Sequence, residues 1–321
     1  MMKWRKLGKI FDPSEHHLFN GPEGFSQSPQ ALVLDDCVRI YFSTRSKDPS
    51  NGKYFSNIAF ADFDLQFNRV LRVSEKEVIA LGNLGCFDEH GIFPMNILRH
   101  GDRIYAWTGG WNRRISVSVD TAIGFAVSDD NGITFRKLGE GPVMAATLNE
   151  PFLVGDPYVY YFKGRFHMWY IYGTRWIRHD NHEQAERVYK VAHALSDNGI
   201  SWEREGVQII DDRLGENECQ AMPTVIYTGG RYHMYFCFRH AYDFRTNRER
   251  GYRLGYATSE DLKNWVRDDS KAGIDISAQG WDSEMQCYPN LFHCDGEVYM
   301  LYNGNEFGRS GFGIALLEDT A

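Results

Sequence analysis

Five segments of the chain share one order of polar and apolar positions. In each segment, polar or acidic residues lead to a proline, an apolar strand, a turn and a second strand rich in aromatic residues. The prolines that mark these segments are Pro29, Pro94, Pro157, Pro223 and Pro289. They are 65, 63, 66 and 66 residues apart, so one structural unit recurs along the whole chain.

Each unit has room for four strands. The second strand follows a tight turn that begins with glycine, as in 164–170 and 230–236, where glycine supplies the positive φ that hairpin turns need. Third strands are expected near 122–126, 191–195 and 254–258. Each of these leads to a polar turn and then to an aromatic residue of a fourth strand. Four short antiparallel strands in a unit of this length are typical of a propeller blade.

The aromatic residues of the fourth strands recur with the same period. They are Trp4, Phe67, Phe135, Trp202 and Trp265, at separations of 63, 68, 67 and 63 residues. Trp4 has no proline strand before it, and the unit after Pro289 has no fourth strand of its own. We therefore expect residues 3–11 to supply the outer strand of the last blade, which closes the ring and removes a free sheet edge.

The expected fold class is all-β, as a five-bladed β-propeller with four antiparallel strands per blade and one domain over 1–321. The expected blades span about 26–82, 88–146, 152–212, 218–276 and 284–317, the last completed by 3–11. A β-sandwich with accidental spacing of the prolines is the competing interpretation.

Composition narrows the class of protein. The 321 residues are 43% hydrophobic and 24% charged, which excludes a disordered, collagenous or coiled-coil chain. No apolar run approaches the length of a membrane-spanning helix. A formal net charge of −8 argues against a nucleic-acid binder. The first residues lack the apolar core of a signal peptide, so we expect a cytoplasmic protein whose six cysteines are reduced.

Acidic residues gather just before the inner strands. Since the first strand of every blade lines the central channel of a propeller, residues at these positions converge at one mouth of the funnel. Crowded carboxylates shift each other's pKa values, which can leave one protonated as a general acid and another ionised as a base. The candidate catalytic residues are Asp88, Glu89, Asp156 and Glu218.

The ends of the second strands are expected to rim the same mouth. Aromatic rings suit sugar faces, and the forked guanidinium of arginine suits anionic groups. The candidate substrate-binding residues from both positions are Ser28, Arg45, His90, Trp111, Arg113, Arg175, Trp176, Arg239, His240, Glu284 and Asn305. A purely structural alternative exists, in which the acids cap exposed backbone N–H groups or pair with these arginines.

The blade pattern, with Asp156-Pro157 and Glu218-Cys219 one blade apart, resembles the propellers of glycoside hydrolase families 43 and 32. The resemblance implies that Glu218 is the general acid and that Asp156 orients it or stabilises the transition state. The families place an acid before the first-blade proline, where this chain has Ser28. A serine hydroxyl is no base without a partner that activates it. Asp88 or Glu89, flanked by Gly85 and Gly91, is the preferred replacement, and Asp282 and Glu284 are the alternatives.

The chain is also similar to the mannoside phosphorylases of family 130, which use one aspartate and a phosphate held by basic residues. The resemblances imply cleavage of a glycosidic bond in a small or anionic saccharide. They leave phosphorolysis or transfer, with phosphate as a partner, and non-catalytic carbohydrate binding as alternatives. No metal or cofactor is expected, although some related propellers hold a calcium ion in the channel. The segment 128–135 is similar to the Asp-box turn of sialidases, an external structural turn.

Overall fold

The computed structural model describes residues 2–21, 24–178 and 184–319, and the chain is all-β. Over these residues the strands form three four-stranded sheets and one eight-stranded sheet. The eight-stranded sheet consists of two halves, β2–β5 and β6–β9, joined by a single parallel pair, Ser56 with Gly91. We call the resulting four-stranded groups units 1 to 5 in chain order.

The strands of units 1 and 2 follow one another along the chain. Unit 1 contains β2 (Gln27–Val33), β3 (Val38–Lys47), β4 (Tyr54–Phe63) and β5 (Val70–Val73). Unit 2 contains β6 (Gly91–His100), β7 (Arg103–Arg113), β8 (Val119–Ser128) and β9 (Arg136–Lys137).

Units 3 to 5 repeat the arrangement. Unit 3 contains β10 (Val154–Phe162), β11 (Arg165–Ile177), β12 (Glu186–Ser196) and β13 (Glu203–Arg204). Unit 4 contains β14 (Glu218–Thr228), β15 (Arg231–His240), β16 (Arg253–Ser259) and β17 (Val266–Arg267). Unit 5 contains β18 (Cys287–Cys294), β19 (Glu297–Asn303), β20 (Phe312–Asp319) and the N-terminal β1 (Lys3–Phe11).

Helical segments are short and lie between the strands. They are η1 (Pro13–Glu15), η2 (Arg248–Arg250), η3 (Asp269–Lys271) and α1 (Asn305–Gly308). No helix of the described residues has the length and apolar character needed to cross a membrane.

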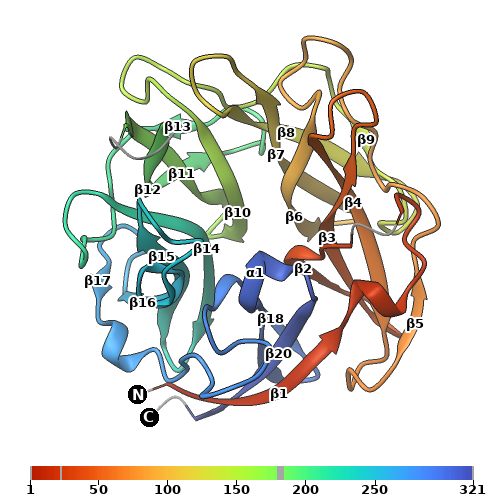
Figure 1. Cartoon of the computed structure of the whole chain (residues 1–321). Coiled ribbons are helices and arrows are strands. Elements are labelled where there is room, and N and C mark those ends of the chain that lie inside the picture. The colour runs from red at the N-terminus through yellow and green to blue at the C-terminus, as the bar shows by residue number, and fades with distance from the viewer. Residues whose placement is uncertain (1, 22–23, 179–183, 320–321) are drawn as a thin grey trace.

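The two ends of the chain meet in unit 5. Strand β1 pairs with β20 antiparallel, from Trp4 opposite Leu317 to Phe11 opposite Phe312. This confirms the expected position of the N-terminal strand on the outside of the last sheet (Figure 1). The Trp4 indole also donates to the Tyr235 hydroxyl at 2.7 Å, which ties the strand to unit 4.

The first strands of the units stand around the centre of a ring (Figure 1). Going round, β2 contacts β6, β6 contacts β10, β10 contacts β14, β14 contacts β18, and β18 contacts β2 again. Side chains link neighbouring strands: the Asn96 amide donates to Gln30 at 3.1 Å, and the Asn290 amide donates to the same Gln30 oxygen at 3.1 Å. The centre is therefore a closed, hydrogen-bonded assembly of inner strands.

The Asp-box-like segment is a turn between β8 and β9. Asp130 accepts hydrogen bonds from the Thr134 backbone N–H at 2.9 Å and hydroxyl at 2.6 Å. The Gly132 carbonyl accepts from the Tyr41 hydroxyl at 2.7 Å, so the turn also fastens unit 2 to unit 1. Its contacts are structural, as its resemblance implied.

The six cysteines are all free, and five of them are buried. Between the units lie clusters of buried aromatic and aliphatic side chains, among them Trp107, Trp169, Tyr170 and Tyr235. Large aromatic side chains bury the most apolar surface per residue, which accounts for the high aromatic content of the repeat.

Candidate active site

The inner strands carry an unusual backbone step at their prolines. The residue before proline normally adopts an extended conformation, but Ser28, Asp156, Met222 and Tyr288 have φ between 50° and 57°. In each strand the pairing register shifts at this step. Such bulges bend a strand and redirect a side chain. The repeat thus builds the same irregularity into four inner strands.

A cavity of about 550 Å³ lies at this level of the ring. It is lined by side chains from all five units and from the loops between their strands. Its acidic lining residues are Asp156, Glu284 and Glu306, and its arginines are Arg45, Arg187, Arg239, Arg245 and Arg309. Its aromatic lining residues are Phe25, Phe93, Trp111, Tyr189, Phe244, Tyr252, Tyr288 and Phe307.

Asp156 belongs to the redirected position of β10. Its side chain lines the cavity although the residue is only 9% exposed. One carboxyl oxygen accepts from the Met222 backbone N–H at 3.2 Å. Burial raises the pKa of Asp156 to about 7, against the opposing effects of this N–H and of the Arg187 charge. A carboxyl that titrates near neutrality can donate a proton there, which an ordinary aspartate cannot do.

Five arginines line the cavity that Asp156 faces, and Arg187 acts on its carboxyl. Arg245 is compensated by Glu186 at 3.0 Å. By contrast, Arg45, Arg187 and Arg239 lie within ion-pair distance of no carboxylate in the described part of the chain. Arg45 instead donates to the Gln27 side chain at 2.7 Å. The cavity is therefore basic within an acidic protein.

Aromatic rings form part of the cavity wall. The Arg45 guanidinium lies 5.2 Å from the Phe25 ring centre, and the Arg309 guanidinium lies 6.0 Å from it. Phe307, on α1, contacts Phe244 edge-on at 6.0 Å, and its backbone carbonyl accepts from the Gln27 amide at 2.6 Å. These contacts join units 5, 4 and 1 across the opening. A wall of aromatic rings and guanidinium groups suits a polar ligand with apolar faces.

Five of the residues selected from the sequence line this cavity. They are Arg45, Trp111, Asp156, Arg239 and Glu284. The repeat placed them at inner-strand starts or second-strand ends, and the structure brings them together from all five units.

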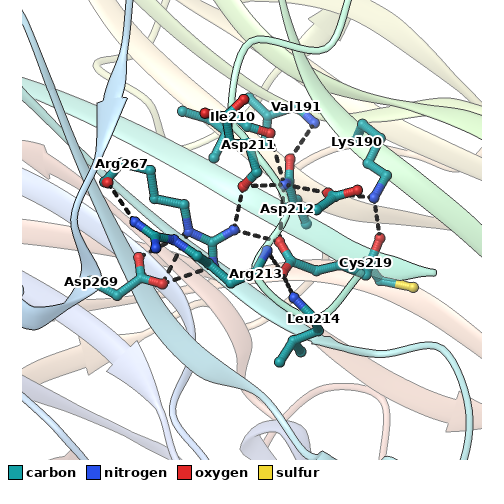
Figure 2. A network of polar contacts seen from close by, with 12 residues as sticks. Lys190, Val191, Ile210, Asp211, Asp212, Arg213, Leu214, Cys219, Arg267 and Asp269 are labelled. Carbon is teal, nitrogen blue, oxygen red and sulfur yellow. Dashed lines mark hydrogen bonds and ion pairs between the residues drawn. The ribbon is translucent and has the colours of Figure 1, made fainter. Parts of the chain in front are cut away.

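Glu218 does not line the cavity, which corrects its expected position. Its carboxylate is fully buried and bound on every side: one oxygen contacts Arg267 Nη1 at 2.6 Å and accepts from Gln220 at 3.0 Å. The other accepts from the backbone N–H groups of Arg213 and Leu214 at 2.7 and 2.9 Å. Figure 2 shows the surrounding network, in which Lys190 contacts Asp212 and Arg267 contacts Asp269.

Strand alternation explains this position. Successive side chains of a strand point to opposite faces, so Glu218 and Gln220 share one face of β14. Ala221 belongs to the other set, and it is Ala221 that lines the cavity. The Glu218 side chain of the pair that resembles family 32 therefore faces away from the cavity. Its backbone N–H contacts are those that the structural alternative predicts.

The unit 2 acids also have structural partners. Asp88 is fully buried and forms an ion pair with Lys137 on the outer strand β9. Glu89 accepts from the Gly85 backbone N–H at 2.9 Å, within its own loop. Neither side chain lines the cavity, so the expectation that one of them faces Asp156 as a base is wrong.

The remaining candidates lie around the cavity and contribute no lining side chain. Ser28 is buried, with its hydroxyl 3.7 Å from the Met222 sulfur. His90 is stacked between Phe55 and Trp111, and Arg113 lies 3.6 Å from Asp48.

The others have similar supporting roles. Arg175 donates to Asn217 at 2.6 Å, and Trp176 packs on the apolar core of units 3 and 4. His240 is opposite Glu218 in the β14–β15 pairing. Asn305 accepts from the Glu284 backbone N–H at 2.8 Å, so it shapes the Glu284 loop.

Several lining residues were not selected from the sequence. Arg187 and Tyr189 lie on β12, a third strand, whereas the repeat predicts lining residues at the first and second strands. Arg245, Arg309 and Phe307 lie between strands, where no repeated pattern marks them. The alternation Arg187-Val188-Tyr189 was the available signal for β12. In the described residues, no three histidine, cysteine, aspartate or glutamate side chains are grouped as a metal site.

Two proteins of Mycobacterium tuberculosis match the whole chain. The uncharacterized proteins MT1551 (strain CDC 1551 / Oshkosh) and Rv1502 (strain ATCC 25618 / H37Rv) are each 34% identical over 324 residues. The match covers 99% of this chain and 100% of either relative. The chain belongs to the family of Rv1502. No family model matches it.

Solved structures similar to this Rv1502 family member include several glycoside hydrolases. A complex of BT0996 with RGII has a TM-score of 0.73 at 18% identity, and the match covers 99% of this chain and 93% of BT0996. A second structure, a glycoside hydrolase, has a TM-score of 0.73 at 17% identity, and the match covers 100% of this chain and 93% of that protein. A thermostable family-43 glycoside hydrolase has a TM-score of 0.63 at 13% identity, and the match covers 91% of this chain and 88% of that enzyme. The fold of the chain is thus that of the propeller glycosidases.

Proposed function

We propose that this member of the Rv1502 family is a five-bladed propeller enzyme, with units 1 to 5 as its blades in one domain. It cleaves a glycosidic bond of a small or anionic saccharide in the Asp156 cavity. The observation that carries the proposal is Asp156 itself. It is a buried carboxyl at the redirected step of an inner strand, exposed to a cavity and titrating near neutrality. The fold shared with glycoside hydrolases supports the class of reaction.

In this proposal Asp156 is the proton donor. Its protonated carboxyl transfers the proton to the glycosidic oxygen while the bond between that oxygen and the anomeric carbon breaks. A water molecule attacks the anomeric carbon and releases its own proton to a base. Each turnover consumes one water and leaves two hydroxyl-bearing products. General acid and base catalysis of this kind contributes about 10²- to 10⁴-fold per group.

Glu284 is the base in this proposal. It lines the same cavity, and no cation of the described residues lies within ion-pair distance of its carboxylate. The loop that carries it is held by Asn305, which accepts from the backbone N–H groups of Glu284 and Met285 at 2.8 and 3.3 Å. A positioned but unpaired carboxylate can accept a proton from water.

The test is turnover of 4-nitrophenyl glycosides of pentoses, neutral hexoses and uronic acids by the wild type and single variants. We expect release of nitrophenol by the wild type, which identifies the sugar, and loss in Asp156→Asn of turnover of the methyl glycoside of that sugar, whose leaving oxygen must be protonated. Glu284→Gln should slow hydrolysis, because water attacks poorly without a base. Added azide should restore the rate, because azide replaces water as the attacking group and has no proton to lose. Turnover that persists unchanged in Asp156→Asn would contradict the assignment.

A second candidate function is saccharide binding without turnover. It is favoured by Ser28 before Pro29, where the resembling families carry an acid, and by the absence of Glu218 from the cavity lining. It predicts ligand binding that Asp156→Asn leaves intact and no release of nitrophenol. Release that requires added inorganic phosphate would instead indicate phosphorolysis or transfer.

A further inference from the structure

Arg239 is the most deeply buried of the arginines that line the cavity. It lies near the end of β15, is 2% exposed, and has no carboxylate partner in the part of the chain that the structure describes. Burying an unpaired charge is costly, and proteins normally pair such a group or use it to bind an ion. The structure supplies no internal anion for it.

The hydrogen bonds of Arg239 all go to neutral acceptors. Nη1 donates to the backbone carbonyls of His240 and Ala241 at 2.9 and 3.4 Å. Nη2 donates to the Tyr189 hydroxyl at 2.9 Å. These contacts fix the guanidinium but leave its charge uncompensated.

One edge of the guanidinium has no charged partner. Nε is buried and has no hydrogen-bond partner in the described residues, and the guanidinium's side-chain hydrogen bonds go to the phenols of Tyr189 and Tyr252. Nε and Nη2 share one edge of the guanidinium, the edge that a carboxylate engages through both of its oxygens. The face of the group is covered by Phe244, whose ring centre lies 3.5 Å from it. The stacked ring therefore leaves the N–H groups of the guanidinium, rather than this face, as the part that can bind an anion.

Neighbouring groups strengthen the preference for an anion. The Tyr189 hydroxyl is 2.8 Å from the Tyr252 hydroxyl, so two phenols adjoin the guanidinium in the lining. Arg187 and Arg45 line the same cavity without a described carboxylate partner. Their charges reinforce that of Arg239 in the cavity, where partial burial makes electrostatic attraction stronger than in open water.

We propose that Arg239, with Tyr189 and Arg187, forms a subsite for the carboxylate of an acidic sugar, so that the substrate of the cavity is a uronic acid glycoside. That the ligand is a saccharide rests on the proposed function. That the ligand carries a negative charge rests on the unpaired guanidinium of Arg239. A flat, two-oxygen carboxylate matches the Nε–Nη2 edge, whereas a neutral hydroxymethyl group would leave the charge unpaired. The neutral sugar should therefore bind more weakly than the uronic acid, because the guanidinium charge stays unpaired in its complex.

The experiment is calorimetric binding of matched ligand pairs to the full-length protein. The probes are the methyl glycosides of glucuronic and galacturonic acid, each compared with the methyl glycoside of the neutral sugar, and inorganic phosphate. We expect at least one uronide to bind roughly tenfold or more tightly than its neutral counterpart, since hydrogen bonds between charged partners are the strong ones. Arg239→Gln should abolish this preference while leaving the weak affinity for the neutral sugar in place.

Two further variants keep the test decisive if Arg239→Gln does not fold. Arg239→Lys retains the charge but loses the two-point edge, and Arg187→Gln removes a partly exposed neighbouring charge. Each should reduce the preference for the uronide. Arg231→Gln is the matched control, since Arg231 lies at the opposite end of β15 and its side chain is 51% exposed. It should bind like the wild type.

Equal affinity for the members of every pair, or no binding by any of these sugars, would overturn the proposal. Phosphate binding that depends on Arg239, without preference for a uronide, would overturn it in favour of a phosphate subsite. Asp156→Asn separates this inference from the proposed function, because it should lose turnover and keep the uronide preference. A wild type that prefers uronides but hydrolyses no glycoside would refute the proposed function and leave the subsite standing.

Discussion

Asp156 and Glu218 are both buried acids on neighbouring inner strands, yet their surroundings differ completely. Asp156 has one backbone N–H partner and faces a cavity. Glu218 has an arginine, an amide and two backbone N–H groups, and it faces the interior of the protein. The comparison teaches that burial alone does not identify a reactive acid. What sets Asp156 apart is a carboxyl with few partners beside open space, which is the setting expected of a reactive acid.

The largest expected difference between the two acids concerns catalysis. Asp156→Asn removes the proposed proton donor and should lower kcat by roughly 10³-fold, with little change in ligand affinity. Turnover of the methyl glycoside of the sugar that the wild type cleaves, measured at pH 6, checks this, because its leaving oxygen must be protonated. A rise in KM by the same factor, with kcat unchanged, would mean that Asp156 contributes to substrate binding and not to catalysis.

Glu218→Gln should affect stability instead. It removes one partner of a buried ion pair, which typically costs about 3 to 5 kcal/mol, and the lower end applies because Asp269 still contacts Arg267 at 2.9 Å. Urea unfolding followed by tryptophan fluorescence measures the change. A variant with wild-type stability and no turnover would restore Glu218 as a catalytic candidate.

The pH dependence of stability should distinguish the acids again. Because the pKa of Asp156 is raised to about 7 in the folded state, the folded protein binds a proton that the unfolded chain has already released. This contribution to stability is fully present below about pH 4 and is lost as the pH rises through 7. Asp156→Asn should therefore be about as stable as the wild type at pH 4 and more stable at pH 8. An identical pH profile for the two proteins would show that Asp156 is ionised in the fold.

The smallest effect on the free energy of unfolding is expected from a substitution of Glu216, two residues before Glu218. The side chain of Glu216 is 81% exposed and lies 3.5 Å from Arg175. Pairs of this kind are screened by solvent, so Glu216→Gln should change the free energy of unfolding by less than about 0.5 kcal/mol. This variant is the control for Glu218→Gln in the same urea experiment. A loss similar to that of Glu218→Gln would mean that the whole segment, rather than the buried pair, determines stability.

Part of the site was accessible from the sequence because the repeat marks equivalent positions. Asp156 before Pro157 and Arg239 at the end of a second strand were both selected in this way, and both line the cavity. Glu218 was selected by the same reasoning and lies elsewhere, because the alternation of β14 and the shift at Met222 decide which face each residue takes. Ala221 in the cavity and Gln220 in the network are adjacent residues whose side chains point to opposite faces of β14.

The chain's own pattern determined the all-β class, the recurring four-stranded unit and the pairing of the N-terminal strand with the last unit. These depend on local periodicity and turn chemistry, which are written in consecutive residues. Only the tertiary structure decided which charges find a partner. Asp88 pairs with Lys137 and Glu218 with Arg267, 49 residues apart in each case, while Arg239 finds no carboxylate among the described residues. Coulomb interactions depend on distance in space and on burial, and neither quantity can be read from the order of residues along the chain.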